Sequence, residues 1–117
     1  EIVVEGGVVS GPIPSAQPDG TLVEVRDVFF NVPARRKFLR SESTEQSHVV
    51  RLVERFALAR FDVAFRLRSG TRVLLDVPAA PSPGAQRDRI ATVMGREFAA
   101  SCLELERESG PVRLAGW

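Results

Sequence analysis

The chain has 117 residues, of which 44% are hydrophobic and 26% charged, as in folded globular proteins and unlike disordered chains. No apolar run approaches the roughly 20 residues of a membrane-spanning helix, and the first residues lack the basic region of a signal peptide. The net charge of +1 gives no global argument for nucleic-acid binding. The sequence does not start with Met, so we expect it to lie within a longer protein.

The first third of the chain predicts strands separated by a loop. Residues 1–9 indicate a short strand interrupted at Gly6-Gly7, and residues 10–20 are rich in Pro and Gly and indicate a loop. Residues 21–30 alternate between two faces, which predicts a strong strand. Pro33 ends it, because proline cannot donate to a β-ladder.

The central third predicts a helix followed by a hairpin. The helix covers about residues 43–60, with one apolar face directed at the core. Residues 61–67 alternate cleanly, and residues 71–77 return as the partner strand after a turn at Ser69-Gly70. The residues expected on the core face of the helix are Val49, Leu52, Val53, Phe56 and Arg60.

The last third predicts a second helix and a second hairpin. The helix covers residues 85–100, with a break at Gly95, and the hairpin pairs residues 103–108 with 112–115. This order of elements indicates the α+β fold class, a layered α/β sandwich. The apolar residues expected to point inward from the second helix are Ile90, Val93, Met94 and Phe98.

The sequence contains no complete catalytic constellation. It lacks a Walker A loop, a GxGxxG segment and a Ser-His-Asp signature. Its single cysteine, Cys102, and single histidine, His48, form no metal-ligand cluster. Both are predicted to be packing residues.

Two segments contain residues that could bind a ligand or a phosphate. Gly20-Thr21 leads into the predicted strand, and a glycine there lets the backbone approach a ligand while the Thr21 hydroxyl donates or accepts. Residues 31–40 carry four cations and no acid, a pattern that suits phosphate contacts or a solvated charged surface. The four cations are Arg35, Arg36, Lys37 and Arg40.

The same region resembles the signature segment of the MutL family of DNA mismatch repair proteins. The resemblance covers Gly20-Thr21 and residues 23–39, VEVRDVFFNVPARRKFL, and continues through residues 57–63, ALARFDV, to residues 113–117, RLAGW. Phe30 stands where the family more often has Tyr.

The resemblance implies two domains. Residues 1–30 would be the C-terminal strands of an ATP-binding domain of the type shared by gyrase, Hsp90 and histidine kinases. Residues 31–117 would be part of a transducer domain with the second-domain fold of ribosomal protein S5. Gly20 and Thr21 would match the last ATP-site motif, and Arg35, Arg36, Lys37 and Arg40 would lie near a DNA-facing groove.

The family's function implies partners and cofactors for a full-length parent. That parent would be a cytoplasmic, nucleoid-associated bacterial ATPase that binds ATP and magnesium, dimerises through its N-terminal region and clamps DNA. It would act with a mismatch-recognition protein and with a downstream nuclease or helicase, away from membranes. The family's catalytic Glu helix, magnesium-binding Asn and DNGxG segment do not occur here, so we expect this chain alone to bind no cofactor and to have no ATPase activity.

Two other functions fit the same residues. The chain could be a standalone nucleic-acid-binding module that uses the segment 35–40, or a structural or dimerisation fragment with solvated charges. Salt-dependent DNA binding by the chain itself separates these two readings.

Overall fold

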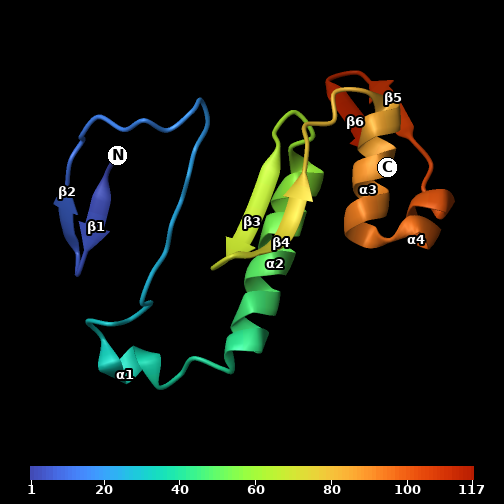
Figure 1. Ribbon diagram of the computed structural model, residues 1–117. Helices are drawn as coiled ribbons and strands as arrows, with labels where there is room; N and C mark the ends of the chain where they lie inside the picture. Colours follow the sequence, from blue (N-terminus) through green and yellow to red (C-terminus); the bar gives the residue numbers. More distant parts are fainter. The chain divides into compact units, whose positions relative to one another are not determined.

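The structure, a computed structural model, describes residues 1–117 and contains two compact units, Glu1–Glu42 and Ser43–Trp117 (Figure 1). The first unit holds β1 (Val3–Glu5), β2 (Val8–Ser10) and α1 (Pro33–Arg36). The second unit is built from α2 (Glu42–Ala59), β3 (Phe65–Ser69), β4 (Arg72–Val77), α3 (Pro83–Met94), α4 (Arg96–Ser101), β5 (Leu105–Ser109) and β6 (Val112–Gly116), with the first residue of α2 at the boundary.

The predicted interruption at Gly6-Gly7 is a hairpin turn. Strands β1 and β2 are antiparallel, with Val4 opposite Val9. Gly6 and Gly7 have φ of 58° and 90°, values that glycine adopts without the steric penalty of a Cβ atom. The turn therefore depends on glycine at both positions.

The strand predicted for residues 21–30 is wrong. Residues 21–26 have no regular secondary structure, and turns follow from Asp27. A strand is held by hydrogen bonds to a neighbour, and β1 and β2 pair only with each other. Alternation in the sequence predicted the side-chain pattern but could not supply a partner strand.

Helix α2 and the hairpin β3–β4 form the first core cluster of the second unit. The helix confirms the prediction for residues 43–60, and the hairpin confirms the predicted pairing with its turn one residue later, at Gly70-Thr71. Phe65 pairs with Val77, whereas Leu74 is a bulge between two registers. The buried members of the cluster are Ala57, Leu75 and Val77, with Val53, Phe65, Leu67 and Val93 packed against them.

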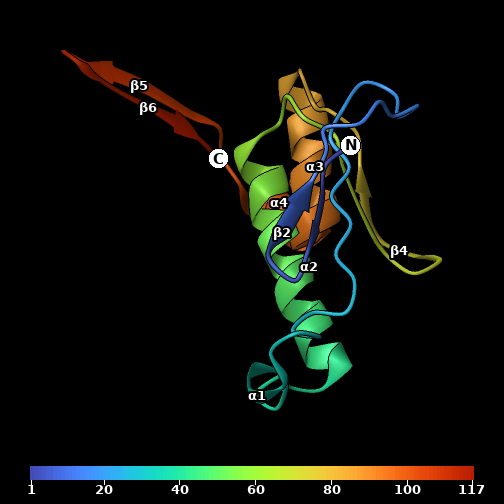
Figure 2. The same ribbon diagram turned by 90° about the vertical axis from the view of Figure 1, so that its left-hand side faces the viewer.

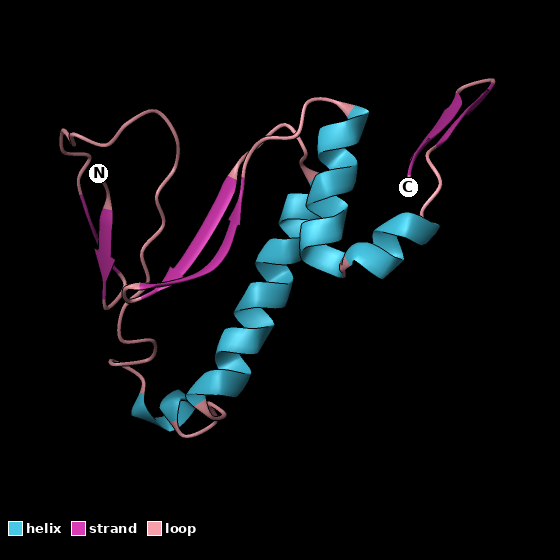
Figure 3. Ribbon diagram, turned by 45° about the vertical axis from the view of Figure 1, so that its right-hand side comes forward, coloured by secondary structure: helices cyan, strands magenta, loops and turns pink.

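A break at Gly95 separates α3 from α4, as predicted (Figure 3). Gly95 has φ 97° and ψ 152°, a conformation essentially restricted to glycine. The two helices then contact each other and form a second core cluster. Its buried members are Ile90, Ala99 and Cys102, with Leu58, Phe61, Ala91 and Trp117 around them.

Strands β5 and β6 form the second predicted hairpin. Its turn is at Gly110-Pro111, and Arg107 lies opposite Leu114. Every residue of both strands is exposed, and Figure 2 shows the hairpin projecting away from α3 and α4. Cross-strand hydrogen bonds, rather than burial, hold it together in this chain.

Some predicted core positions are wrong. The exposed fractions of Val49, Leu52 and Phe56 on α2 are 48%, 50% and 52%. Met94 and Phe98 are also about half exposed, and Arg60 lies beyond the helix on the surface. The apolar stripes are wider than the two-stranded hairpin and the neighbouring helix can cover.

The combination of helices and strands agrees with the α+β class. The three sheets have two strands each and are not joined to one another. None of the helices has the length and apolarity required to cross a bilayer.

Candidate nucleic-acid interface

The predicted cationic segment lies on α1 and just beyond it. Pro33 occupies the first turn of the helix, where a missing N–H costs nothing. Arg35 and Arg36 form the last turn, and Lys37 caps it. These side chains and that of Arg40 are exposed, and no acid occurs between Asp27 and Glu42.

Two turns redirect the chain just before this helix. Asp27 and Phe29 have φ of 47° and 61°, which is uncommon for residues other than glycine. The Phe30 N–H donates to the Asp27 carbonyl at 3.0 Å, and the Val32 N–H donates to the Phe29 carbonyl at 3.1 Å. The bend is therefore defined by backbone hydrogen bonds, and the short helix starts from it.

The nearest upstream cation, Arg26, differs from Arg35, Arg36 and Lys37 because a carboxylate neutralises it. Arg26 Nε donates to Glu24 Oε1 at 2.7 Å, and this hydrogen bond lowers the pKa of Glu24 and raises that of Arg26. Arg35, Arg36 and Lys37 form no ion pair. Their charges are available to an anionic partner.

Gly20 and Thr21 lie in an exposed loop of the same unit. Gly20 has φ 139°, and the space where a Cβ would project is open, so the loop suits close approach by a ligand. Neither residue lines either of the two best-formed cavities, and the chain has no group of three or more His, Cys, Asp or Glu side chains that could hold a metal ion. The two residues do not make a nucleotide site by themselves.

Arg89 is a buried charged residue whose role the sequence did not predict. Its side chain lies in the second unit and is 3% exposed. Nη1 donates to the carbonyls of Ala57 and Arg60 at 3.0 Å each, and Nη2 donates to those of Val63 (2.9 Å) and Pro78. The sequence signal was a charged residue on the apolar face of a predicted helix, directly before Ile90.

The environment of Arg89 is that of a structural clamp. Burial lowers the pKa of its guanidinium, and the carboxylate of Asp62 partly opposes that shift. Its guanidinium also lies 5.7 Å from the centre of the Phe61 ring. The carbonyl of Ala57 lies in the last turn of α2, where helix carbonyls lack intrahelical partners. That of Arg60 follows the helix and also accepts from the Val63 N–H at 3.3 Å, so Arg89 supplies above all the donor that Ala57 would otherwise lack.

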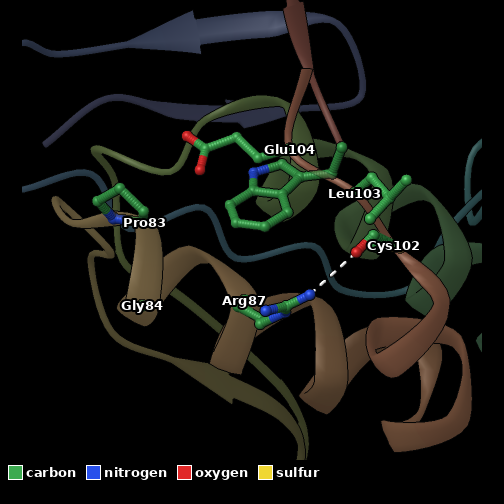
Figure 4. A pocket seen from close by; sticks show the side chains of 7 residues that line it. Pro83, Gly84, Arg87, Cys102, Leu103 and Glu104 are labelled. Atoms are coloured by element: carbon green, nitrogen blue, oxygen red, sulfur yellow. Dashed lines mark hydrogen bonds between the residues drawn. The ribbon is translucent and has the colours of Figure 1, made fainter. Parts of the chain in front are cut away.

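A cavity of about 340 Å³ lies where α3 begins (Figure 4). Arg87 Nη2 points across it to the Cys102 carbonyl at 2.9 Å, and the Arg87 guanidinium lies 5.8 Å from the Trp117 ring centre. The lining is mainly apolar, with Glu104 as the one acid. None of the predicted site residues lies here, and the cation is already engaged, so no catalytic group is assembled.

Comparison with known proteins identifies relatives along nearly the whole chain. No protein-family model matches it. The DNA mismatch repair protein MutL of Paramagnetospirillum magneticum is 47% identical over 116 residues, which are 97% of this chain and 19% of that protein. The MutL proteins of Cellvibrio japonicus and Azotobacter vinelandii are 48% and 52% identical and cover 100% and 89% of the chain.

The chain therefore belongs to the MutL family of DNA mismatch repair proteins and is a fragment of such a protein. It spans less than a fifth of the length of these relatives, 19% for two of them and 16% for the third.

Proposed function

We propose that the chain is part of a DNA mismatch repair clamp ATPase, in which it couples ATP-driven dimerisation to DNA binding and repair signalling. The single observation that carries this proposal is the exposed, acid-free cationic segment of residues 28–41, in a chain about half identical to MutL proteins. Backbone phosphates are the anions that such a segment meets on DNA.

Two sites in the first unit take separate roles. Thr21 lines the nucleotide pocket that the rest of the parent completes, and Gly20 lets the backbone approach the nucleotide. Arg35, Arg36, Lys37 and Arg40 contact DNA phosphates. We place the ATP-binding domain's last strands in residues 1–30 and the S5-like transducer domain in residues 31–117.

The chain path supports coupling between these sites. Only the residues 22–34 separate Thr21 from the first cation of the cluster, and the bend at Asp27–Val32 lies within them. The cluster in turn leads within two residues of Arg40 into α2, whose far end Arg89 clamps. A displacement of the Thr21 loop on nucleotide binding would therefore act on a short connection to the cations.

The full-length parent supplies the remaining components of this function. It binds ATP and magnesium with residues outside this chain and forms a homodimer through its N-terminal region. Its other partners are a mismatch-recognition protein and a downstream nuclease or helicase, in the cytoplasm and close to the nucleoid.

Charge reversal in the full-length parent tests the DNA contact. The variant Arg35→Glu, Arg36→Glu, Lys37→Glu should bind matched and mismatched duplexes more weakly and to the same extent, because phosphate contacts carry no sequence information. Each lost contact should reduce the slope of log affinity against log salt by about 0.9. Fluorescence anisotropy at several salt concentrations measures both quantities.

The variant Arg35→Lys, Arg36→Lys is the matched control, because it keeps the charge and should keep the salt slope. Melting temperatures of all variants separate loss of contact from loss of folding. An unchanged affinity and slope in a folded charge-reversed protein would refute the DNA contact.

The nucleotide role is tested by Thr21→Ala in the same parent. Loss of one hydrogen bond should weaken ATP binding by up to about tenfold, whereas Thr21→Ser keeps the hydroxyl and should bind normally. Equal affinities for the parental and Ala proteins, measured by calorimetry, would remove Thr21 from the pocket.

A further inference from the structure

The hairpin β3–β4 carries a second acid-free cationic stretch. Residues 63–75 contain Arg66, Arg68 and Arg72 and no acid, from Asp62 to Asp76. Apart from residues 28–41, no other acid-free stretch of the chain holds three cations. The second stretch lies on a different element and in a different unit.

The cations of the hairpin are not equally available. Arg66 is paired across the strands with Asp76, with Nη2 2.8 Å from Oδ2, and this contact raises the pKa of Arg66. Arg68 and Arg72 form no ion pair, and both are exposed. Two uncompensated charges therefore remain, both close to the turn.

The register places these two charges on either side of the turn. Arg68 lies opposite Val73, and Arg72 lies opposite Ser69, so the two arginines come from adjacent positions of the paired strands and extend from opposite faces of the hairpin. Between them, Gly70 has φ 57° and no atom within 4 Å of where a Cβ would be. The backbone at the turn is accessible, and N–H groups and hydroxyls such as that of Thr71 are common phosphate donors.

The end of the hairpin away from the turn is packed in the core. Phe65 and Leu67 of β3 lie against the core that buries Leu75 and Val77 of β4. The turn end, in contrast, stands clear of the helices of its own unit in Figures 2 and 3. An element that is anchored by its base and charged at its tip can reach a groove or backbone without unfolding.

We propose that Arg68 and Arg72 at the tip of the hairpin β3–β4 form a second contact with the phosphate backbone of DNA. The contact rests on the proposed function, since it assumes that the parent binds DNA, but it uses residues separate from the segment 35–40. It is electrostatic and independent of base sequence, because phosphates are the ligands.

The test uses the full-length parent with Arg35, Arg36 and Lys37 intact. Arg68→Gln, Arg72→Gln removes two phosphate contacts, so the salt slope should fall by about 1.8 and the affinity at 0.1 M salt by about tenfold to a hundredfold. Arg68→Lys, Arg72→Lys keeps both charges and should restore the slope. Binding of a random-sequence duplex is measured by anisotropy from about 0.05 to about 0.3 M salt, a range over which the screening of exposed charges increases.

The matched control is Arg96→Gln, Arg107→Gln. These arginines are also exposed, but Glu97 follows the first, and Glu106 and Glu108 flank the second, so their loss should leave the slope unchanged. Melting temperatures of every variant confirm that each protein is folded.

The outcomes separate the two proposals. A parental salt slope in the folded Gln variant overturns the hairpin contact and leaves the proposed function standing. An equal loss in the Gln and Lys variants also overturns it, because the effect would then not follow charge. A parental protein that binds no DNA at all overturns the proposed function and the hairpin contact together.

Discussion

The two units differ in how far they have a core of their own. Every buried apolar residue lies in the second unit: Ala57, Leu75, Val77, Ala80, Ile90, Ala99 and Cys102. In the first unit no residue is buried, and only Phe29 and Val32 are partly covered. Both units contain paired antiparallel β-hairpins. A stretch of sequence can therefore form regular backbone structure without forming a hydrophobic core.

Two valines make this difference concrete. Val9 in β2 is 66% exposed, whereas Val77 in β4 is 2% exposed. Both lie in antiparallel strands opposite another apolar residue. The difference arises from what covers the strand, since α2 packs on β4 and no helix packs on β2 in this chain.

The largest expected effect comes from removing the clamp of the second unit. Arg89→Met removes the donor of the Ala57, Val63 and Pro78 carbonyls, whereas the Arg60 carbonyl keeps the Val63 N–H. The variant should lower the free energy of unfolding by about 3–5 kcal/mol. Urea unfolding followed by circular dichroism measures it. Arg87→Met, which removes a single hydrogen bond to Cys102, should cost only about 1 kcal/mol; equal costs would show that Arg89 is no clamp.

Matched valine truncations compare the two units directly. Val77→Ala removes buried methyl groups and leaves a cavity, so it should destabilise the chain by about 2 kcal/mol. Val9→Ala should change the stability by less than about 0.5 kcal/mol, because its side chain is exposed. The same urea titration gives both values, and a larger loss from Val9→Ala would reverse the comparison.

Glycines of positive φ offer a similar pair. Gly95→Ala at the α3–α4 break should cost about 1–2 kcal/mol, because φ 97° strains an alanine. Gly20→Ala, at φ 139° in the loop of the first unit, should scarcely alter the melting temperature of the chain, since no packed structure depends on that loop. If thermal melting shows the reverse order, the first unit contributes more stability than its burial indicates.

The smallest effect concerns local ion pairs, of which each unit has one between residues two positions apart. Arg60 donates two hydrogen bonds to Asp62, at 2.8 and 2.7 Å, and lowers the pKa of Asp62 to about 2. The stabilising contact is therefore complete above the ordinary carboxyl pKa of 3.8 and is lost as the pH falls through about 2. Carboxyl NMR titration should show this midpoint.

The control for this titration is Arg60→Gln, which should return the midpoint of Asp62 towards 3.8. The Glu24 carboxyl of the first unit should also titrate below its ordinary range, because Arg26 bonds to it in the same way. Pairs two residues apart need no core, so a normal midpoint at Glu24 would mean that the first unit lacks even local order.

The sequence predicted those elements whose signals are local. Both hairpins of the second unit, the helix α2 and the break at Gly95 were predicted, because alternation, helical spacing and glycine act over a few residues. The prediction of a strand at residues 21–30 was wrong because a strand needs a hydrogen-bonded neighbour, which lies elsewhere in the sequence and leaves no local signal. The prediction that Phe56 and Phe98 lie in the core was wrong for the same reason, since periodicity identifies an apolar face but not the element that covers it.

The candidate site was predictable in part. Counting charges located the cations Arg35, Arg36 and Lys37, and the structure adds that they are exposed on and beside a short helix. Whether they contact DNA stays a prediction, as does the role of Gly20-Thr21. Arg89 could not be recognised as a clamp, because its acceptors are main-chain carbonyls, which no side-chain pattern marks.

The sequence separations of the Arg89 hydrogen bonds lead to an expectation about the order in which the second unit assembles. The four acceptors of Arg89 precede it by 32, 29, 26 and 11 residues. Bringing such distant points together costs loop-closure entropy before any bond is gained, so the fork closes only when α2 has ended and β4 has returned. We therefore expect these bonds to form after the folding transition state and to act mainly by slowing the opening of the finished structure.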